Sequence, residues 1–246
     1  MTAAHPDLED NPASTVDHTF EHLLLDIVGG TYPGGSRLPS ERDLAAALEC
    51  SRSTLREALG RLAEWSLIET RRGSGMVVRH RREWSMYVLP AYLRASAGAS
   101  TPATLGRLVL DLLHVRRTIF VDIVGAMSDR LARAPLARAR QTVQAAWDAR
   151  ADHGQFVRHD FDVLRALAEA ADFLPGLWIL NSFAPVYFEI ADLVSAAGAI
   201  PANYLQSWDG FFAALAEGDG VLATERLDAY LRAHDTALLD TLGIQP

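Results

Sequence analysis

The sequence predicts a mostly α-helical protein with an N-terminal winged helix-turn-helix and a C-terminal all-α helical bundle. Three observations lead to this prediction. Two short amphipathic segments meet at a brief turn near residue 50, and two β-prone runs follow them within residues 67–79. After residue 102 the apolar residues recur at helical spacing, with little strand signal. The 246 residues have room for two modest domains, and an apolar content of 49% is that of a globular chain.

The N-terminal elements come first. Residues 1–17 are polar and are expected to form a flexible arm before a winged domain over residues 18–80. A first helix is expected over residues 19–28, because its apolar stretch stops at the helix-breaking pair Gly29-Gly30.

The next two segments have the capping pattern of a helix-turn-helix. Ser40 can cap the first helix, and Asp43 three residues later completes a capping box. Ser51 can cap the second helix after the short turn Leu48-Glu-Cys. The second helix has one apolar stripe, made of Leu55, Ala58, Leu59, Leu62 and Ala63.

The first turns of this second helix carry guanidinium and hydroxyl groups. Arg52, Ser53, Thr54 and Arg56 lie mostly off the apolar stripe, where such groups can meet phosphates and base edges in a major groove. Alone, the helix would also fit an ordinary amphipathic surface helix with a solvated face.

A β-hairpin is expected directly after this helix. Residues 67–70 and 76–79 are short β-prone runs, and the segment Arg71-Arg-Gly-Ser-Gly75 between them has the glycines of a tight turn and two positive charges. Helix, turn, helix and basic hairpin together indicate a winged helix-turn-helix.

These motifs resemble the N-terminal signature of GntR-family bacterial transcription regulators. The similar segments are Leu38-Pro-Ser-Glu-Arg42, Ser51-Arg-Ser-Thr-Leu-Arg-Glu-Ala-Leu59 and Gly73-Ser-Gly75, within residues 20–80. Ser66 departs from the pattern, because the family usually has Gly before the first wing strand. The resemblance implies base readout by Arg52 and Arg56, and minor-groove or phosphate contact by the wing tip. The implied DNA-contacting residues are Arg42, Ser51, Arg52, Ser53, Thr54, Arg56, Arg72 and Gly73.

The charge distribution agrees with a DNA-binding segment. The net charge is −8, and all 23 basic residues are arginine. Residues 37–82 hold ten Arg and six acidic residues, whereas residues 1–36 and 100–246 each carry a net charge of −6. The only basic block therefore coincides with the predicted helix-turn-helix and wing.

The sequence predicts a cytoplasmic protein that does not enter the membrane. Cys50 is the only cysteine, which excludes an intrachain disulfide, and no signal peptide is visible. The longest uncharged run, residues 173–188, is shorter than the roughly 20 residues of a membrane span and contains Pro175 and Pro185. We expect it to be a buried helix.

A linker and a helical domain follow the wing. Residues 81–101 contain three aromatic residues that suggest a docked linker helix, with a small-residue hinge over 95–102. Residues 102–246 are expected to form an effector-binding and dimerisation domain of six or seven helices. These helices are expected over residues 103–127, 135–151, 155–171, 175–194, 203–216 and 221–242.

The C-terminal half resembles the ligand-binding domain of the FadR branch of that family, and its fatty-acyl-CoA-responsive members more than its metal-binding ones. The similar motifs are Trp84-Ser, Leu112-Leu-His-Val-Arg116, Phe161-x-x-Leu-Arg-Ala-Leu-Ala, and Gly176-Leu-Trp-Ile-Leu-Asn181 followed by Tyr187.

The chain departs from the branch at the positions where its members bind their ligands. At the metal-ligand positions of the branch the chain has Arg158, Asp162, Asp209 and His234, a poor set for a transition metal, so no metal or cofactor is expected. At the positions that the fatty-acid regulators offer to their ligand, the last helix has Arg232, Ala233, Thr236 and Asp240.

Four polar residues within apolar helical patterns are candidates for effector binding: Arg116, Asn181, Tyr187 and His234. Each would equally fit a core or interface residue whose hydrogen bonds are satisfied within the protein. Trp147, Trp178 and Trp208 are expected in the core.

The function that these patterns favour is a ligand-responsive transcription regulator, by default a repressor, which binds a near-palindromic operator as a homodimer and responds to a fatty acyl-CoA. Two alternatives stay open: the same kind of regulator sensing a small carboxylate or a metal-bound metabolite, and a DNA-binding protein without a ligand. An enzyme is not expected, because no nucleophile elbow, nucleotide-binding glycine loop or zinc motif is present.

Overall fold

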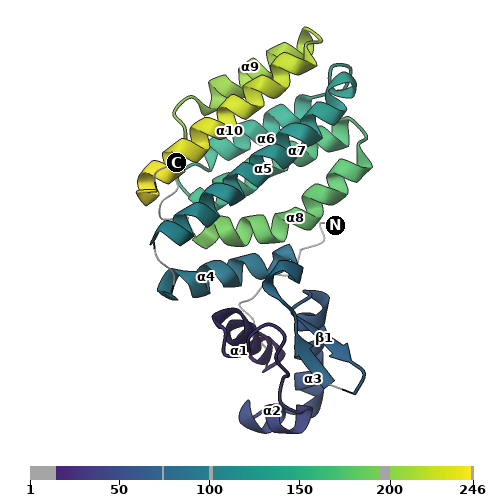
Figure 1. The fold of residues 1–246 in the computed structure, drawn as a ribbon. Helices are drawn as coiled ribbons and strands as arrows, with labels where there is room; N and C mark the ends of the chain where they lie inside the picture. Colours follow the sequence, from purple (N-terminus) through teal and green to yellow (C-terminus); the bar gives the residue numbers. More distant parts are fainter. Residues whose placement is uncertain (1–14, 74, 100–101, 194–199, 245–246) are drawn as a thin grey trace, which may run out of the picture. The chain divides into compact units, whose positions relative to one another are not determined.

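The computed structural model describes residues 15–73, 75–99, 102–193 and 200–244 (Figure 1). The chain divides into two compact units, residues 1–100 and residues 101–246. Most of the expected N-terminal arm lies outside the described residues, and residues 15–17 already belong to the first helix. Within the described ranges, no helix combines the length and apolar character that a membrane span requires.

The first unit contains the predicted winged helix-turn-helix. Its elements are α1 (Thr15–Gly29), α2 (Glu41–Ala47), α3 (Arg52–Glu64), β1 (Ile68–Arg71) and β2 (Gly75–Val78). The apolar stripes of α1 and α3 pack against each other, because each repeats at three- and four-residue spacing. The fully buried side chains of this core include Leu23, Leu24, Ile27, Leu55, Leu59 and Leu62.

The two helices of the motif begin at the predicted caps. The Ser40 hydroxyl accepts a hydrogen bond from the Asp43 amide at 3.3 Å, and the Ser51 hydroxyl accepts one from the Thr54 amide at 3.1 Å. Between them the chain turns through Glu49, which has a left-handed backbone with a φ of 50°. This turn ends α2 and directs the chain into α3.

The wing is an antiparallel hairpin whose register runs from Ile68 opposite Val78 to Arg71 opposite Gly75. Gly73 and Gly75 have φ values of 78° and 75°, a region that glycine enters without steric cost. Ser66 precedes β1 with a φ of 61°. The family's usual glycine would fit this backbone better than serine does.

The connector after the wing packs on the first unit. It consists of η1 (Arg81–Glu83), η2 (Met86–Val88) and α4 (Leu89–Ala99), so the expected hinge is helical up to residue 99. The Trp84 indole donates to the Arg79 carbonyl at 3.0 Å. The Tyr87 ring stacks on the Trp65 ring, with 5.8 Å between the ring centroids. Residues 100 and 101, which also belong to the expected hinge, lie outside the described residues.

The second unit is an all-α bundle with six helices in its described residues (Figure 1). Helix α7 packs against α6 and α8, and α10 packs against α9 and α5. Aromatic side chains fill much of the core, including Phe156, Phe161, Tyr204, Phe211 and Phe212. The six helices are α5 (Pro102–Leu131), α6 (Ala137–Asp148), α7 (His153–Ala170), α8 (Leu174–Leu193), α9 (Tyr204–Ala216) and α10 (Gly220–Leu242).

Helix α8 differs from the prediction of a buried helix. Trp178 is 63% exposed, and Leu174 and Ile179 are also exposed, while Leu180 and Ala184 are buried. The prediction was wrong because an apolar run does not reveal on how many sides a helix is covered. Pro185 lies inside α8 without ending it.

Candidate functional site

The N-terminal end of α3 presents a polar, exposed surface. Arg52, Ser53 and Arg56 are exposed, and the two arginines lie four residues apart on one face of the helix. The Ser51 hydroxyl lies 2.8 Å from the hydroxyls of both Ser53 and Thr54. These contacts hold three hydroxyl groups together at the helix end, where phosphate or base edges could meet them.

The three arginines of the helix-turn-helix have different surroundings. Arg56 donates from Nε to Glu41 Oε2 at 2.7 Å, whereas Arg42 Nε lies 3.6 Å from a carboxylate oxygen of its neighbour Asp43. In the part of the chain that is described, Arg52 has no ion-pair or hydrogen-bond partner for its guanidinium. Arg52 can therefore bind a new partner without breaking an existing contact.

The tip of the wing is also exposed and positively charged. Arg72 and Gly73 are exposed, and Arg37 donates from Nη2 to the Gly73 carbonyl at 2.9 Å. Arg37 also forms a β-bridge with Val77, so the segment before α2 supports the hairpin. The sequence-predicted residues Arg72 and Gly73 thus lie on a tip that is tied back to the domain.

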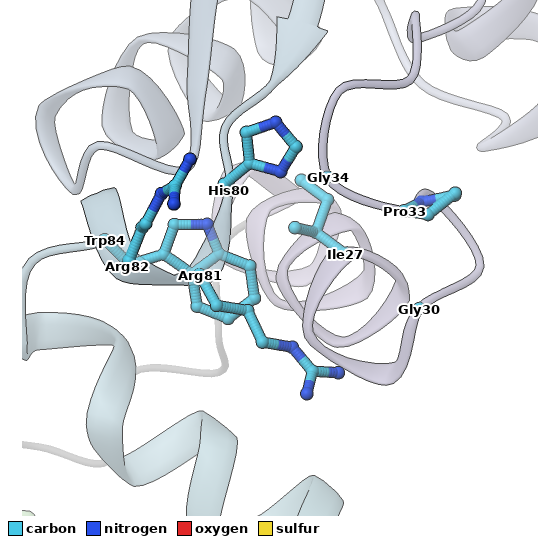
Figure 2. A pocket seen from close by; sticks show the side chains of 8 residues that line it. All are labelled: Ile27, Gly30, Pro33, Gly34, His80, Arg81, Arg82 and Trp84. Atoms are coloured by element: carbon cyan, nitrogen blue, oxygen red, sulfur yellow. The ribbon is translucent and has the colours of Figure 1, made fainter.

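A cavity of about 560 Å³ lies in the first unit, between the end of α1 and the segment that follows the wing (Figure 2). Arg81 and Arg82 give it a basic rim, and His80 and the Trp84 ring form part of its wall. The loop after α1 passes close by, since a Cβ at Gly34 would lie 3.0 Å from His80 Nδ1. Its lining residues are Ile27, Gly30, Pro33, Gly34, His80, Arg81, Arg82 and Trp84.

The helical unit contains a buried charged network. Arg116 on α5 is 6% exposed and donates from Nη2 to Asp235 Oδ1 on α10 at 2.5 Å. Its Nη1 also lies 3.4 Å from the Tyr187 hydroxyl on α8. Arg117 bonds the other Asp235 oxygen at 3.2 Å and contacts Asp228 at 3.2 Å. Each buried charge therefore has an opposite charge nearby, as burial requires.

A second buried carboxylate lies between two tyrosines. Asp160 on α7 accepts hydrogen bonds from the Tyr204 hydroxyl at 3.0 Å and the Tyr230 hydroxyl at 2.9 Å. Burial raises the pKa of Asp160, although both hydroxyl bonds act in the opposite direction. Burial and the nearby carboxylate likewise raise the pKa of both tyrosines, so their hydroxyls stay protonated and donate.

His234 lies beside this network, next to Asp235 on α10. Burial, together with the positive charge of Arg116, lowers the pKa of His234 to about 3. Its Nδ1 is buried, and so is Arg116 Nε, and neither atom has a hydrogen-bond partner among the described residues. Such atoms could bind a ligand or a water molecule.

The four predicted effector residues do not lie together. Arg116 and Tyr187 are in contact, and His234 is close enough for Arg116 to affect its pKa. Asn181 instead lies on the exposed face of α8, where its side-chain oxygen accepts from Arg165 Nε at 3.0 Å.

Among the positions that correspond to metal or fatty-acid ligands in the FadR branch, His234 lies beside the buried charged network. Arg158 forms a bidentate ion pair with Asp192, in which Nη1 donates to Oδ1 at 3.0 Å and Nη2 donates to Oδ2 at 2.8 Å. The described residues contain no group of three or more His, Cys, Asp or Glu that could hold a metal ion. The four last-helix positions lie on the exposed face of α10: Arg232, Ala233, Thr236 and Asp240.

Comparison with known proteins identifies the family. The family model for bacterial regulatory proteins of the gntR family matches residues 15–78. The fatty acid metabolism regulator protein of Cronobacter sakazakii is 32% identical over 175 residues, which are 69% of this chain and 68% of that protein. The chain belongs to the GntR family. The HTH-type transcriptional regulator Mce2R of Mycobacterium tuberculosis is 28% identical over 237 residues, covering 94% of this chain and 95% of that protein.

A solved structure of this fold agrees. The structure of Lar, which controls the expression of the Listeria monocytogenes agr system, has a TM-score of 0.58 at 15% identity, covering 94% of this chain and 99% of that one. This GntR-family protein is therefore a DNA-binding transcription regulator, with a winged helix N-terminal domain and a helical C-terminal domain.

Two residues of the GntR-family domain were not predicted as functional, although both lie in contact with predicted ones. Arg37 holds the wing tip, and Glu41 holds Arg56. Glu41 is part of the Leu38–Arg42 motif, so its place in the signature was visible. The contact between Glu41 and Arg56 could not be predicted from the sequence, because 15 residues separate the two.

Proposed function

We propose that this GntR-family regulator binds a near-palindromic operator as a homodimer and represses transcription until an effector binds the helical unit. The observation that carries this proposal is the capped, exposed N-terminal end of α3 with the unpaired guanidinium of Arg52. A two-fold dimer would place one such helix on each half-site. The protein would act in the cytoplasm, where the chromosome lies.

On the operator, Arg52 and Arg56 would contact base edges, because the guanidinium fork matches the O6 and N7 acceptors of guanine. The hydroxyls at the start of α3, Arg42 and the wing tip would contact phosphates or the minor groove and fix the register. The proposed contact residues are Arg42, Ser51, Arg52, Ser53, Thr54, Arg56, Arg72 and Gly73.

The effector in this proposal is a fatty acyl-CoA. Support comes from the relative named as a fatty acid metabolism regulator. The effector would meet α10 near Arg116, Tyr187 and His234, because Arg116 contacts Tyr187 and lies close to His234. It can shift DNA affinity only by binding one arrangement of the protein better than another.

A small carboxylate is the second candidate effector. Two buried nitrogen atoms favour it, because Arg116 Nε and His234 Nδ1 have no hydrogen-bond partner among the described residues. Each could donate a hydrogen bond to a carboxylate oxygen, His234 as the tautomer with a proton on Nδ1.

The proposal is tested by fluorescence anisotropy of the purified protein on DNA from its own promoter, with and without a long-chain acyl-CoA. The salt concentration is held fixed, because phosphate contacts make affinity depend on it. Release of DNA at micromolar acyl-CoA is the expected result. If the protein bound this DNA specifically and acyl-CoA did not change the affinity, acyl-CoA would not be the effector, and small carboxylates would be tested next.

A further inference from the structure

Glu41 and Arg56 join the two helices of the helix-turn-helix. Glu41 is the first residue of α2, and Arg56 lies in the second turn of α3. Arg56 Nε donates to Glu41 Oε2 at 2.7 Å, and no hydrogen bond from the Arg56 Nη atoms is formed within the described part of the chain. One edge of the guanidinium is therefore occupied, and the edge formed by Nη1 and Nη2 is available.

The available edge has the chemistry of a base-recognising group. A guanidinium is planar, and two N–H groups along one edge can bind guanine O6 and N7 together. A hydrogen bond from Nε to a carboxylate restricts rotation of the guanidinium and leaves its Nη1–Nη2 edge directed away from that carboxylate. The side chain then loses less conformational freedom when it binds.

Among the three predicted DNA-contacting arginines of the motif, Arg56 alone is held by a carboxylate from a different helix within the described residues. Arg42 lies near its sequence neighbour Asp43 at 3.6 Å, and Arg52 has no such partner. The Arg56 side chain is 68% exposed, so this ion pair contributes little to folding stability. A role in orienting the arginine explains the contact better than a role in stability.

We propose that Glu41 is a positioning residue, which fixes the Arg56 guanidinium for end-on recognition of a guanine and thereby sets operator specificity without itself touching DNA. The proposal rests on the proposed DNA contact by α3. It assigns to α2 a part in sequence discrimination, in addition to its part in placing α3.

Simple electrostatics gives the opposite expectation for removal of this charge. A carboxylate near the phosphates repels DNA, so its neutralisation should strengthen binding to any duplex. Loss of the positioning contact should instead weaken binding to the operator relative to other DNA. The ratio of the two dissociation constants therefore distinguishes a positioning role from a general charge effect.

The test compares E41A with the wild type on two duplexes, one from the protein's own promoter and a scrambled sequence of equal length, at one salt concentration. Alanine is used because the amide oxygen of a glutamine could still accept the hydrogen bond from Arg56 Nε. The control for the lost charge is E49Q, because Glu49 is an exposed carboxylate in the turn between α2 and α3. We expect E41A to reduce the ratio of scrambled to promoter dissociation constants by about tenfold. E49Q should strengthen binding to both duplexes alike and leave the ratio unchanged.

A second variant separates positioning from misfolding. R56K keeps the charge but has no planar fork, so adding E41A to R56K should cause no further loss of discrimination. Equal ratios for E41A and wild type would overturn the inference, and so would an additional loss in the double variant. A wild-type protein that does not discriminate the two duplexes would overturn the proposed DNA contact itself.

Discussion

At the scale of single residues, His234 links the stability of the helical unit to pH. Its folded pKa of about 3 lies below its ordinary value of 6.5, mainly because the ring is buried. Below pH 6.5 the His234 ring therefore takes up a proton in the unfolded chain, while it stays neutral in the folded chain. The stability that the neutral ring provides is complete above pH 6.5 and is lost as the pH falls toward 3.

Because of this group, we expect the free energy of unfolding of the wild-type protein to fall by about 2 kcal/mol between pH 7 and pH 5. Each pH unit below the unfolded pKa costs about 1.4 kcal/mol. Urea denaturation at the two pH values measures the loss, and His234→Gln should remove it. His159→Gln, which changes a partly exposed histidine of the same unit, should keep it. If His234→Gln had the same pH dependence as the wild type, the burial of a neutral His234 would be wrong.

At the scale of elements, Asp160 connects three helices through two hydrogen bonds. It lies on α7, while its tyrosine partners belong to α9 and α10. Asp160→Leu would leave both hydroxyls buried without an acceptor, at about 1–3 kcal/mol for each. We expect this variant to lower the free energy of unfolding by at least about 2 kcal/mol in urea denaturation.

Asp160→Asn is the matched comparison for this prediction. The amide can still bond both hydroxyls, and it avoids the cost of a buried charge. We expect Asn to change stability by less than about 1 kcal/mol. A Leu variant as stable as the Asn variant would show that the two tyrosine contacts do not hold the helices together.

The type and order of the elements could be predicted because local chemistry determines them. Ser40 and Ser51 marked two helix starts, and the periodic leucines of α3 marked its buried face. The exposed side of α8 could not be predicted, because apolar residues occur around most of its circumference. How many neighbours cover a helix depends on packing between distant segments, which one sequence does not specify.

The candidate site was predictable to a different degree in each half of the molecule. The first turns of α3 combine charge, hydroxyls and a cap within a few residues, so local sequence was enough to place these groups at the exposed start of one helix. The network around Arg116 depends on Asp235, which is 119 residues away in sequence, and only the fold brings the two together. Asn181 had the same polar-in-apolar pattern as Arg116, yet it lies on the exposed face of α8.

At the scale of the whole molecule, the charge distribution fits the division of functions. The net charge is −8, yet residues 37–82 are basic and include the helix-turn-helix and the wing. The acidic remainder would limit non-specific attraction to DNA, while the basic block would supply the proposed phosphate contacts. Sequence recognition by a molecule of this net charge must therefore depend on a few well-placed groups, and we propose Arg52 as the first of them.

The most direct test of this account is the affinity of Arg52→Ala for operator DNA, measured by fluorescence anisotropy at fixed salt. Arg133→Ala is the control, because it removes the same charge from an exposed position in the helical unit. We expect Arg52→Ala to lose about 1–3 kcal/mol of binding free energy on the operator, and Arg133→Ala to bind like the wild type. Operator binding by Arg52→Ala as tight as that of the wild type would contradict the assignment of α3 as the recognition helix.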